Sequence, residues 1–143
     1  MDIVEKPDFD LTYSSSAETG QVKYAEGRTS ENIFASVGGY FVHNSFIYLP
    51  KKTYLADHRK WYSDGDGTQL CYSAHGDKEE YDKMIETAAE RVLYYLDQSP
   101  DCCTITFTQE DVNRACNCAT SLACKEDFNS LTSSVLMFTN ALE

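Results

Sequence analysis

The sequence predicts an α+β fold, in which an N-terminal antiparallel β meander of two hairpins packs on about three C-terminal helices. Two patterns indicate this fold class. Short apolar runs separated by turn residues occupy positions 33–73, whereas apolar residues recur at helical spacing from position 77 onward. The length of 143 residues and the 42% hydrophobic composition also suit one domain with its own core.

Residues 1–20 differ in composition from the rest of the chain. They contain Pro7, Gly20 and a run of three serines, together with five acidic residues and one lysine. A polar, acidic segment of this kind buries little apolar surface, so we expect a mobile or loosely docked arm. Residues 21–143 are then expected to form the single α+β domain.

The β meander is predicted from two turn signals within residues 33–73. The first hairpin would turn at Asn44 and Ser45, between the apolar runs YFVH and FIYL. The second would turn at the sequence DGDG, residues 64–67, whose glycines tolerate positive φ. Both faces of the first hairpin would be apolar, so we expect the sheet to be covered on both sides or to bind a ligand on one.

A helix over residues 77–99 is the best supported element. Asp77 is a suitable N-cap, Glu80 stands three residues later as its reciprocal partner, and Pro100 follows the end. Its buried stripe is expected to consist of seven apolar residues: Tyr81, Met84, Ile85, Ala88, Val92, Tyr95 and Leu96.

Three further elements follow along the chain. A β-branched run predicts a strand over residues 102–108, and a stripe of small apolar residues predicts a helix over residues 109–125. Residues 128–142 again show helical spacing, although their threonine and valine content leaves a strand as the alternative.

The six cysteines raise the question of a metal site. Zinc is usually held by two paired Cys-x₂₋₄-Cys units, and the arrangement Cys102-Cys103, Cys116-x-Cys118 and Cys124 lacks two such pairs. On the predicted helix, Cys116 and Cys118 would point about 200° apart and could not hold one ion. We therefore expect ordinary buried or half-buried thiols, no metal and no cofactor, with disulfides as the alternative in an oxidising compartment.

No motif in the sequence names a reaction. The DGDG turn fails as a calcium loop because Tyr62 and Ser73 occupy positions that need carboxylates. The chain lacks a nucleophile elbow, a glycine-rich phosphate loop and a paired-carboxylate signature. His43, His58 and His75 are expected to be loop or packing residues, so we predict that the protein is not an enzyme and has no catalytic residues.

The charge of the chain restricts its partners. The formal net charge is −11, which disfavours direct binding to nucleic acid or to anionic lipid and favours a protein partner with a basic surface. No secretory signal and no membrane span are present, so a cytoplasmic location is expected, in the source cell or in a host cell. The charge is uneven, because residues 77–143 carry −8 and residues 33–76 carry +1.

Two groups of residues are candidates for binding such a partner. The first is a basic, aromatic segment, in which arginine, tryptophan and tyrosine are typical of interface hot spots: Lys51, Lys52, Arg59, Lys60, Trp61 and Tyr62. The second is the outward face of the 77–99 helix, with acidic groups at a spacing roughly like that of phosphates: Glu79, Asp82, Glu86, Glu90, Tyr94 and Asp97.

These observations predict a small acidic binding or inhibitor protein that docks on a basic macromolecular surface and partly mimics the charge of nucleic acid. Compact acidic domains without catalytic motifs are typical of viral and phage antagonists of host or defence machinery. The alternative is a protein that binds or sequesters a small anionic or nucleotide-like molecule, with Arg59 and Lys60 beside the aromatic hairpins. A thiol- or zinc-dependent enzyme ranks third.

Overall fold

The computed structural model describes residues 11–12, 23–24, 37, 42–64, 67–100, 104–112 and 114–142. In this part the chain is mainly helical, so the predicted α+β fold with an N-terminal β meander is wrong. Its five α-helices are α2 (Ser45–Tyr48), α3 (Lys51–Tyr54), α4 (Lys78–Asp97), α5 (Ala119–Phe128) and α6 (Ser133–Asn140). Two short 3₁₀ turns accompany them, η1 (Arg59–Trp61) and η2 (Ala74–Gly76).

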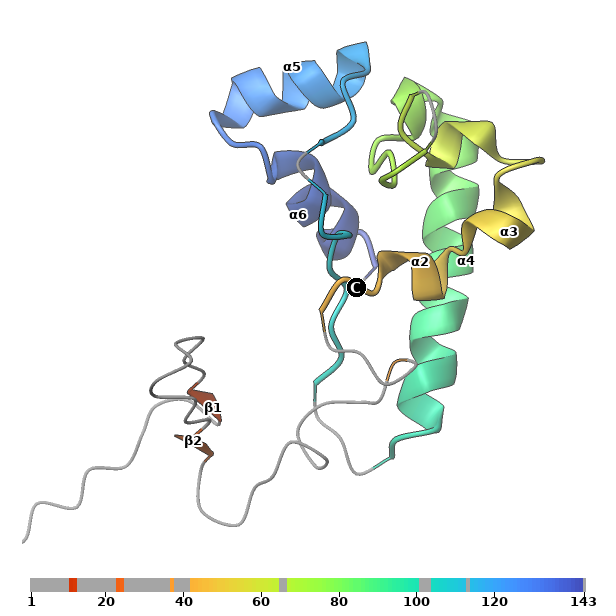
Figure 1. The fold of residues 1–143 in the computed structure, drawn as a ribbon, viewed down its shortest axis with the longest axis vertical. Helices are drawn as coiled ribbons and strands as arrows, with labels where there is room; N and C mark the ends of the chain where they lie inside the picture. Colours follow the sequence, from red (N-terminus) through yellow and green to blue (C-terminus); the bar gives the residue numbers. More distant parts are fainter. Residues whose placement is uncertain are drawn as a thin grey trace, which may run out of the picture.

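The strands that the structure describes lie outside the predicted meander. β1 (Leu11–Thr12) pairs antiparallel with β2 (Lys23–Tyr24), so that Leu11 stands opposite Tyr24. The other residues of the predicted 1–20 arm lie outside the described residues. Figure 1 shows α4 as the long rod of the molecule, with α5 and α6 together on the other side.

The first predicted hairpin is replaced by α2. Ser45, Tyr48 and Leu49 are buried at the spacing i, i+3 and i+4, which a helix provides and a strand does not. A run of four apolar residues does not distinguish the two by itself. Asn44 is not a turn residue but a buried side chain, whose amide group donates to Thr106 O and accepts from Thr108 N at 3.1 and 2.9 Å.

The N-terminus of α2 is completed by a residue from far along the chain. Glu110 Oε1 accepts the backbone N–H of Phe46 and the hydroxyl of Ser45, each at 2.9 Å. The Gln69 amide in turn bonds both backbone groups of Glu110, at 2.6 and 3.3 Å. Two buried amides, Asn44 and Gln69, therefore hold the segment 104–110 in place of the strand predicted at 102–108.

The second predicted hairpin survives only as one antiparallel bridge, between Tyr62 and Leu70. η1 stands where its first strand was expected, and η2 directly follows the residues expected for its second strand. The DGDG turn is confirmed at Gly67, whose φ is +61°, while residues 65–66 lie outside the described residues.

The predicted 77–99 helix is confirmed as α4. The Asp77 side chain accepts the backbone N–H of Glu80 at 3.1 Å, as an N-cap does. The reciprocal bond is absent among the described residues, because the Glu80 carboxylate instead accepts His58 Nδ1 at 3.0 Å. Met84 and Ala88 are fully buried along the predicted stripe.

The helix predicted over 109–125 begins much later than expected. α5 starts at Ala119, and the described residues between 109 and 118 are not helical. The small residues of this segment imitate a helical stripe without forming a helix. Within the predicted 128–142 segment, α6 forms over Ser133–Asn140, so this part is a helix and not the alternative strand.

An aromatic core joins α2, η1, α4 and α6. Tyr48 stacks on Phe107 with ring centroids 4.8 Å apart, and Phe138 lies 5.4 Å from Tyr72. Its buried members come from residues 37–88 and from α6: Val37, Tyr48, Leu49, Trp61, Tyr62, Leu70, Tyr72, Met84, Ala88 and Phe138. None of the helices in the described ranges combines the length and the apolar character that crossing a bilayer requires.

Candidate functional site

The aromatic residues of the predicted basic surface are core residues. Trp61 is 1% exposed and donates its indole N–H to Glu80 O, and Tyr62 is 0% exposed and donates its hydroxyl to Leu49 O. His58 stacks on Trp61 with ring centroids 4.0 Å apart. Neither Trp61 nor Tyr62 is therefore available as an interface anchor.

The basic residues of that segment are spread over different elements. Lys51 and Lys52 lie in α3, and Arg59 donates to the carbonyls of Tyr62 and Ser63. Lys60 Nζ lies 2.6 Å from Asp77 Oδ2, and this bond raises the pKa of Lys60 and lowers the pKa of Asp77. Arg59 and Lys60, two of the four basic residues, thus make hydrogen bonds within the fold.

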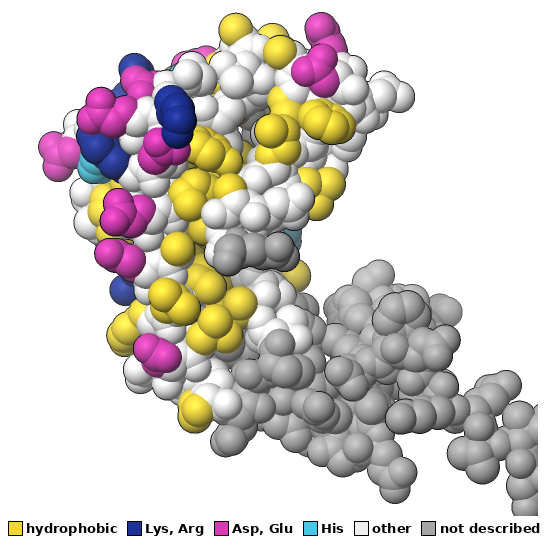
Figure 2. All heavy atoms as spheres, turned by 180° about the vertical axis from the view of Figure 1, so that it is seen from behind, with side chains coloured by type: hydrophobic (Ala, Val, Ile, Leu, Met, Phe, Trp, Pro, Cys, Tyr) yellow, Lys and Arg dark blue, Asp and Glu magenta, His cyan; other side chains and the backbone are white. Residues whose placement is uncertain are grey.

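The six residues predicted on α4 do lie on its outer face, but they divide into two halves. In the N-terminal half, Asp82 pairs with Lys78 at 2.6 Å and Glu79 pairs with Lys83 at 2.8 Å. In the C-terminal half, Glu86, Glu90 and Asp97 are exposed and have no ion-pair partner among the described residues. Figure 2 shows acidic side chains spaced along this edge of the molecule.

Two large side chains stand among the unpaired carboxylates. Leu93 is 60% exposed and Tyr94 is 50% exposed. The Arg91 guanidinium lies 5.1 Å from the Tyr94 ring centroid and 5.3 Å from that of Tyr95, which orients the exposed ring. We call the set Glu86, Glu90, Leu93, Tyr94 and Asp97 the α4 patch.

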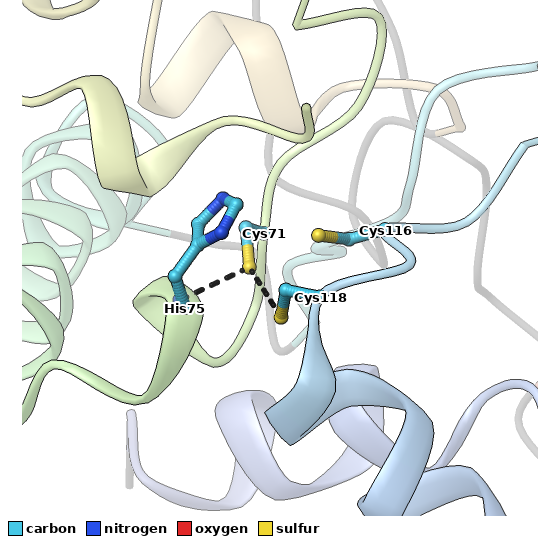
Figure 3. A group of neighbouring side chains, drawn as sticks. All are labelled: Cys71, His75, Cys116 and Cys118. Carbon is cyan, nitrogen blue, oxygen red and sulfur yellow. Dashed lines mark hydrogen bonds between the residues drawn. The ribbon is translucent and has the colours of Figure 1, made fainter. Parts of the chain in front are cut away.

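A second site was not predicted. Cys71, His75, Cys116 and Cys118, here called the thiol cluster, each offer a ligand atom, and these atoms all lie within 4.8 Å of one another. Figure 3 shows Cys71 and His75 on the turn that ends in η2, facing Cys116 and Cys118 on the segment that leads into α5. The three cysteines are at most 9% exposed.

The sulfur atoms of the thiol cluster accept backbone N–H groups. His75 N lies 3.3 Å from Cys71 Sγ, and Ser121 N lies 3.4 Å from Cys118 Sγ. The second of these contacts makes Cys118 the N-cap of α5. The Sγ atoms of Cys71 and Cys118 are 3.7 Å apart, and both cysteines are free thiols.

The surroundings favour a thiolate at Cys71. A hydrogen bond from the Cys116 thiol holds the pKa of Cys71 well below its usual range, with further donors at Ser73 and the His75 N–H. The same pairing and burial raise the pKa of Cys116. The pairing therefore favours the thiolate form at Cys71 over that at Cys116.

The predicted separation of Cys116 and Cys118 is wrong. It assumed that both lie on a helix, but neither lies inside α5, so their side chains converge. Cys124 lies within α5 outside the cluster, with its thiol donating to Met137 Sδ at 3.2 Å. The missed residues, Cys71 and His75, carry a Cys-x₃-His spacing that the sequence does show.

An apolar groove of about 520 Å³ lies between the start of α4, α5 and α6. Its walls include Tyr81, Ala123, Phe128 and Met137. Neither Arg59 nor Lys60 lines it, so the groove is not the anionic-ligand site that the alternative hypothesis placed beside them.

Comparisons of the chain with protein-family models, with curated proteins and with solved structures found no match.

Proposed function

We propose that this chain is a non-catalytic binding protein that docks the α4 patch on a basic surface of a protein partner. The observation that carries the proposal is the pair of exposed large side chains, Leu93 and Tyr94, among three carboxylates without ion-pair partners in the described chain. Exposed apolar and aromatic groups supply contact energy, and unpaired rim charges supply orientation and rate.

The division of α4 into two halves supports this choice of surface. Each acidic side chain at the start of the stripe already has a lysine one turn away, at Lys78 or Lys83. Such i,i+4 pairs neutralise the local field and leave little for a partner. The C-terminal half keeps its charge, so a cationic partner is drawn to Glu86, Glu90 and Asp97 first.

The charges of the α4 patch are more widely spaced than the phosphates of nucleic acid. The patch therefore mimics nucleic acid only in part, which favours a protein partner. Glu86, Glu90 and Asp97 are spread over 11 residue steps, which on a helix is about 16 Å, so neighbouring charges are on average roughly 8 Å apart. One strand of DNA carries a phosphate about every 3.4 Å. The net charge of −11 still adds a long-range field of the same sign.

A matched pair of variants tests the proposal. Glu86→Gln with Glu90→Gln removes two charges from the α4 patch, and Glu79→Gln with Asp82→Asn removes two charges from the paired half of the same helix. Each tagged protein is used to capture partners from a lysate of its natural host at low and high salt, followed by mass spectrometry and affinity measurement.

We expect the first variant to bind the captured partner about tenfold more weakly at low salt, equivalent to about 1.4 kcal/mol, and the second to bind as the parent does. The parent's affinity should fall as salt rises. Equal losses in the two variants, or an affinity that salt does not change, would contradict docking through the α4 patch.

A further inference from the structure

We infer that Cys71, His75, Cys116 and Cys118 form a tetrahedral zinc centre that fastens the start of α5 to the 71–76 turn. This goes beyond the proposed docking function, since the centre involves none of the residues of the α4 patch. The inference stands on the donor set, the distances between donors and the way that α5 is held.

The number and type of donors fit structural zinc. Three cysteine sulfurs and one imidazole nitrogen make up the Cys₃His set, and four protein ligands leave no open position for a substrate. Soft thiolates in a tetrahedral arrangement select zinc over the oxygen-preferring ions magnesium and calcium. The centre is accordingly structural rather than catalytic.

The spacing of the sulfurs also fits a shared ion. With zinc–sulfur bonds of about 2.3 Å and a tetrahedral angle, two sulfurs stand about 3.8 Å apart. Cys71 Sγ and Cys118 Sγ are 3.7 Å apart, far longer than the roughly 2.05 Å of a disulfide. Figure 3 shows the two segments presenting these atoms toward each other.

The groups around the donors are arranged as they are around metal ligands. His75 Nε2 lies 2.9 Å from Tyr62 O, and because a carbonyl only accepts, Nε2 carries the proton and Nδ1 keeps a lone pair. Besides the cysteine sulfurs, Nδ1 has Asp64 Oδ1 as a neighbour, at 3.8 Å. Backbone N–H groups of His75 and Ser121 point to sulfurs, where they stabilise thiolate charge. Ala74 and His75 hold positive φ values of 43° and 55°, a strained turn that places the imidazole in this position.

The competing explanation is that the three cysteines are ordinary buried residues that pack as small apolar side chains. Packing of that kind would join the main core, yet these cysteines form a separate buried cluster whose neighbours include the hydroxyl groups of Ser73 and Ser121. Apolar packing also fails to explain the position of α5, whose only buried residue is Ser121. A metal shared between Cys118 and the 71–76 turn supplies the missing anchor.

The test uses the whole chain, purified without chelator, with metal content measured by mass spectrometry and the site probed by cobalt(II) substitution. We expect one zinc per chain and, with cobalt, tetrahedral ligand-field bands together with a thiolate-to-cobalt charge-transfer band. Cys71→Ser and Cys118→Ser should lose the metal. Cys124→Ser and His43→Gln, which change the same residue types outside the cluster, should keep it.

A conservative replacement keeps the inference testable if the serine variants fail to fold. His75→Cys should retain one zinc and raise the cobalt charge-transfer absorbance in the ratio of four thiolates to three. A metal-free parent that shows no tetrahedral cobalt spectrum and the same Tm with and without added zinc would overturn the centre. So would iron in place of zinc, or binding that Cys124→Ser abolishes and Cys118→Ser does not.

Discussion

Helices α4 and α5 are held in the molecule by different kinds of interaction. α4 buries Met84 and Ala88 in the aromatic core and is capped by Asp77. α5 buries only Ser121, while its largest apolar side chains, Leu122 and Phe128, are 41% and 62% exposed. A ten-residue helix is not stable alone in water, so α5 depends on its attachment at Cys118 and on α6.

This difference shows that one small protein can position helices by two routes. Burial of an apolar stripe spreads the stabilisation along the whole of α4, whereas the attachment of α5 is concentrated at one end. We therefore expect α4 to tolerate single substitutions outside its buried stripe. The position of α5 should be sensitive to the loss of one metal ligand or to one altered contact at its start. The following predictions test this contrast.

The largest effect is expected from the aromatic core. Phe138→Ala removes a fully buried ring that lies 5.4 Å from Tyr72 and 5.3 Å from Phe107, and should lower the free energy of unfolding by about 3–5 kcal/mol. Urea unfolding followed by circular dichroism measures the loss. Phe128→Ala on α5 should cost no more than about 0.5 kcal/mol, and equal costs would remove the contrast between the buried aromatic core, which holds α4, and the exposed apolar side chains of α5.

Removing the metal should release α5 and leave α4 in place. At free zinc 100-fold above its Kd, binding contributes about 2.7 kcal/mol, so chelation should speed amide exchange in Ala119–Phe128 roughly 100-fold. Hydrogen exchange with mass spectrometry measures the amide exchange rates of α4 and α5 in the same sample. Equal acceleration around Met84 and Ala88 would indicate that the centre stabilises the whole fold instead.

A smaller effect is expected where α5 meets η2. A Cβ at Gly76 would collide with Thr120 Oγ1, and the residue has a φ of +80°. Gly76→Ala should therefore cost about 1–2 kcal/mol and weaken zinc binding. Thermal unfolding and zinc titration measure the two effects.

Gly67→Ala is the matched control for that substitution. Gly67 has a φ of +61°, but its added Cβ would meet Tyr62 in the aromatic core, at 3.1 Å. Gly67→Ala should lower Tm without changing zinc affinity. When Thr120→Ala is combined with each glycine variant, it should restore part of the stability lost in Gly76→Ala and none of that lost in Gly67→Ala. Rescue of both variants, or of neither, would contradict a specific approach of α5 to Gly76.

Elements stabilised by local and periodic interactions were predictable from the sequence. Asp77 caps α4 three residues from its partner N–H, and the buried stripe repeats over five turns. The helical spacing of residues 128–142 likewise predicts α6. Both signals lie within a few residues of the element that they specify.

Elements that depend on distant partners were not predictable in this way. The hydrogen bonds of Asn44 reach residues 62 and 64 positions later, so the local pattern at 40–49 resembled a hairpin. The thiol cluster joins Cys71 to Cys118 across 47 positions, and a false helix over 109–118 concealed the convergence. The α4 patch was predicted as part of a longer stripe, but its separation from the paired half needs the side-chain geometry.

The distant cap of α2 has a consequence for synthesis of the chain. The carboxylate that accepts the Phe46 N–H belongs to Glu110, which is added 64 residues later. At about 5–20 residues per second, the ribosome needs roughly 3–13 s to supply it. During that interval the start of α2 lacks its native acceptor, while α4 is synthesised with its own cap already beside it. The nascent chain should therefore complete α4 first and close α2 only after residue 110 has emerged.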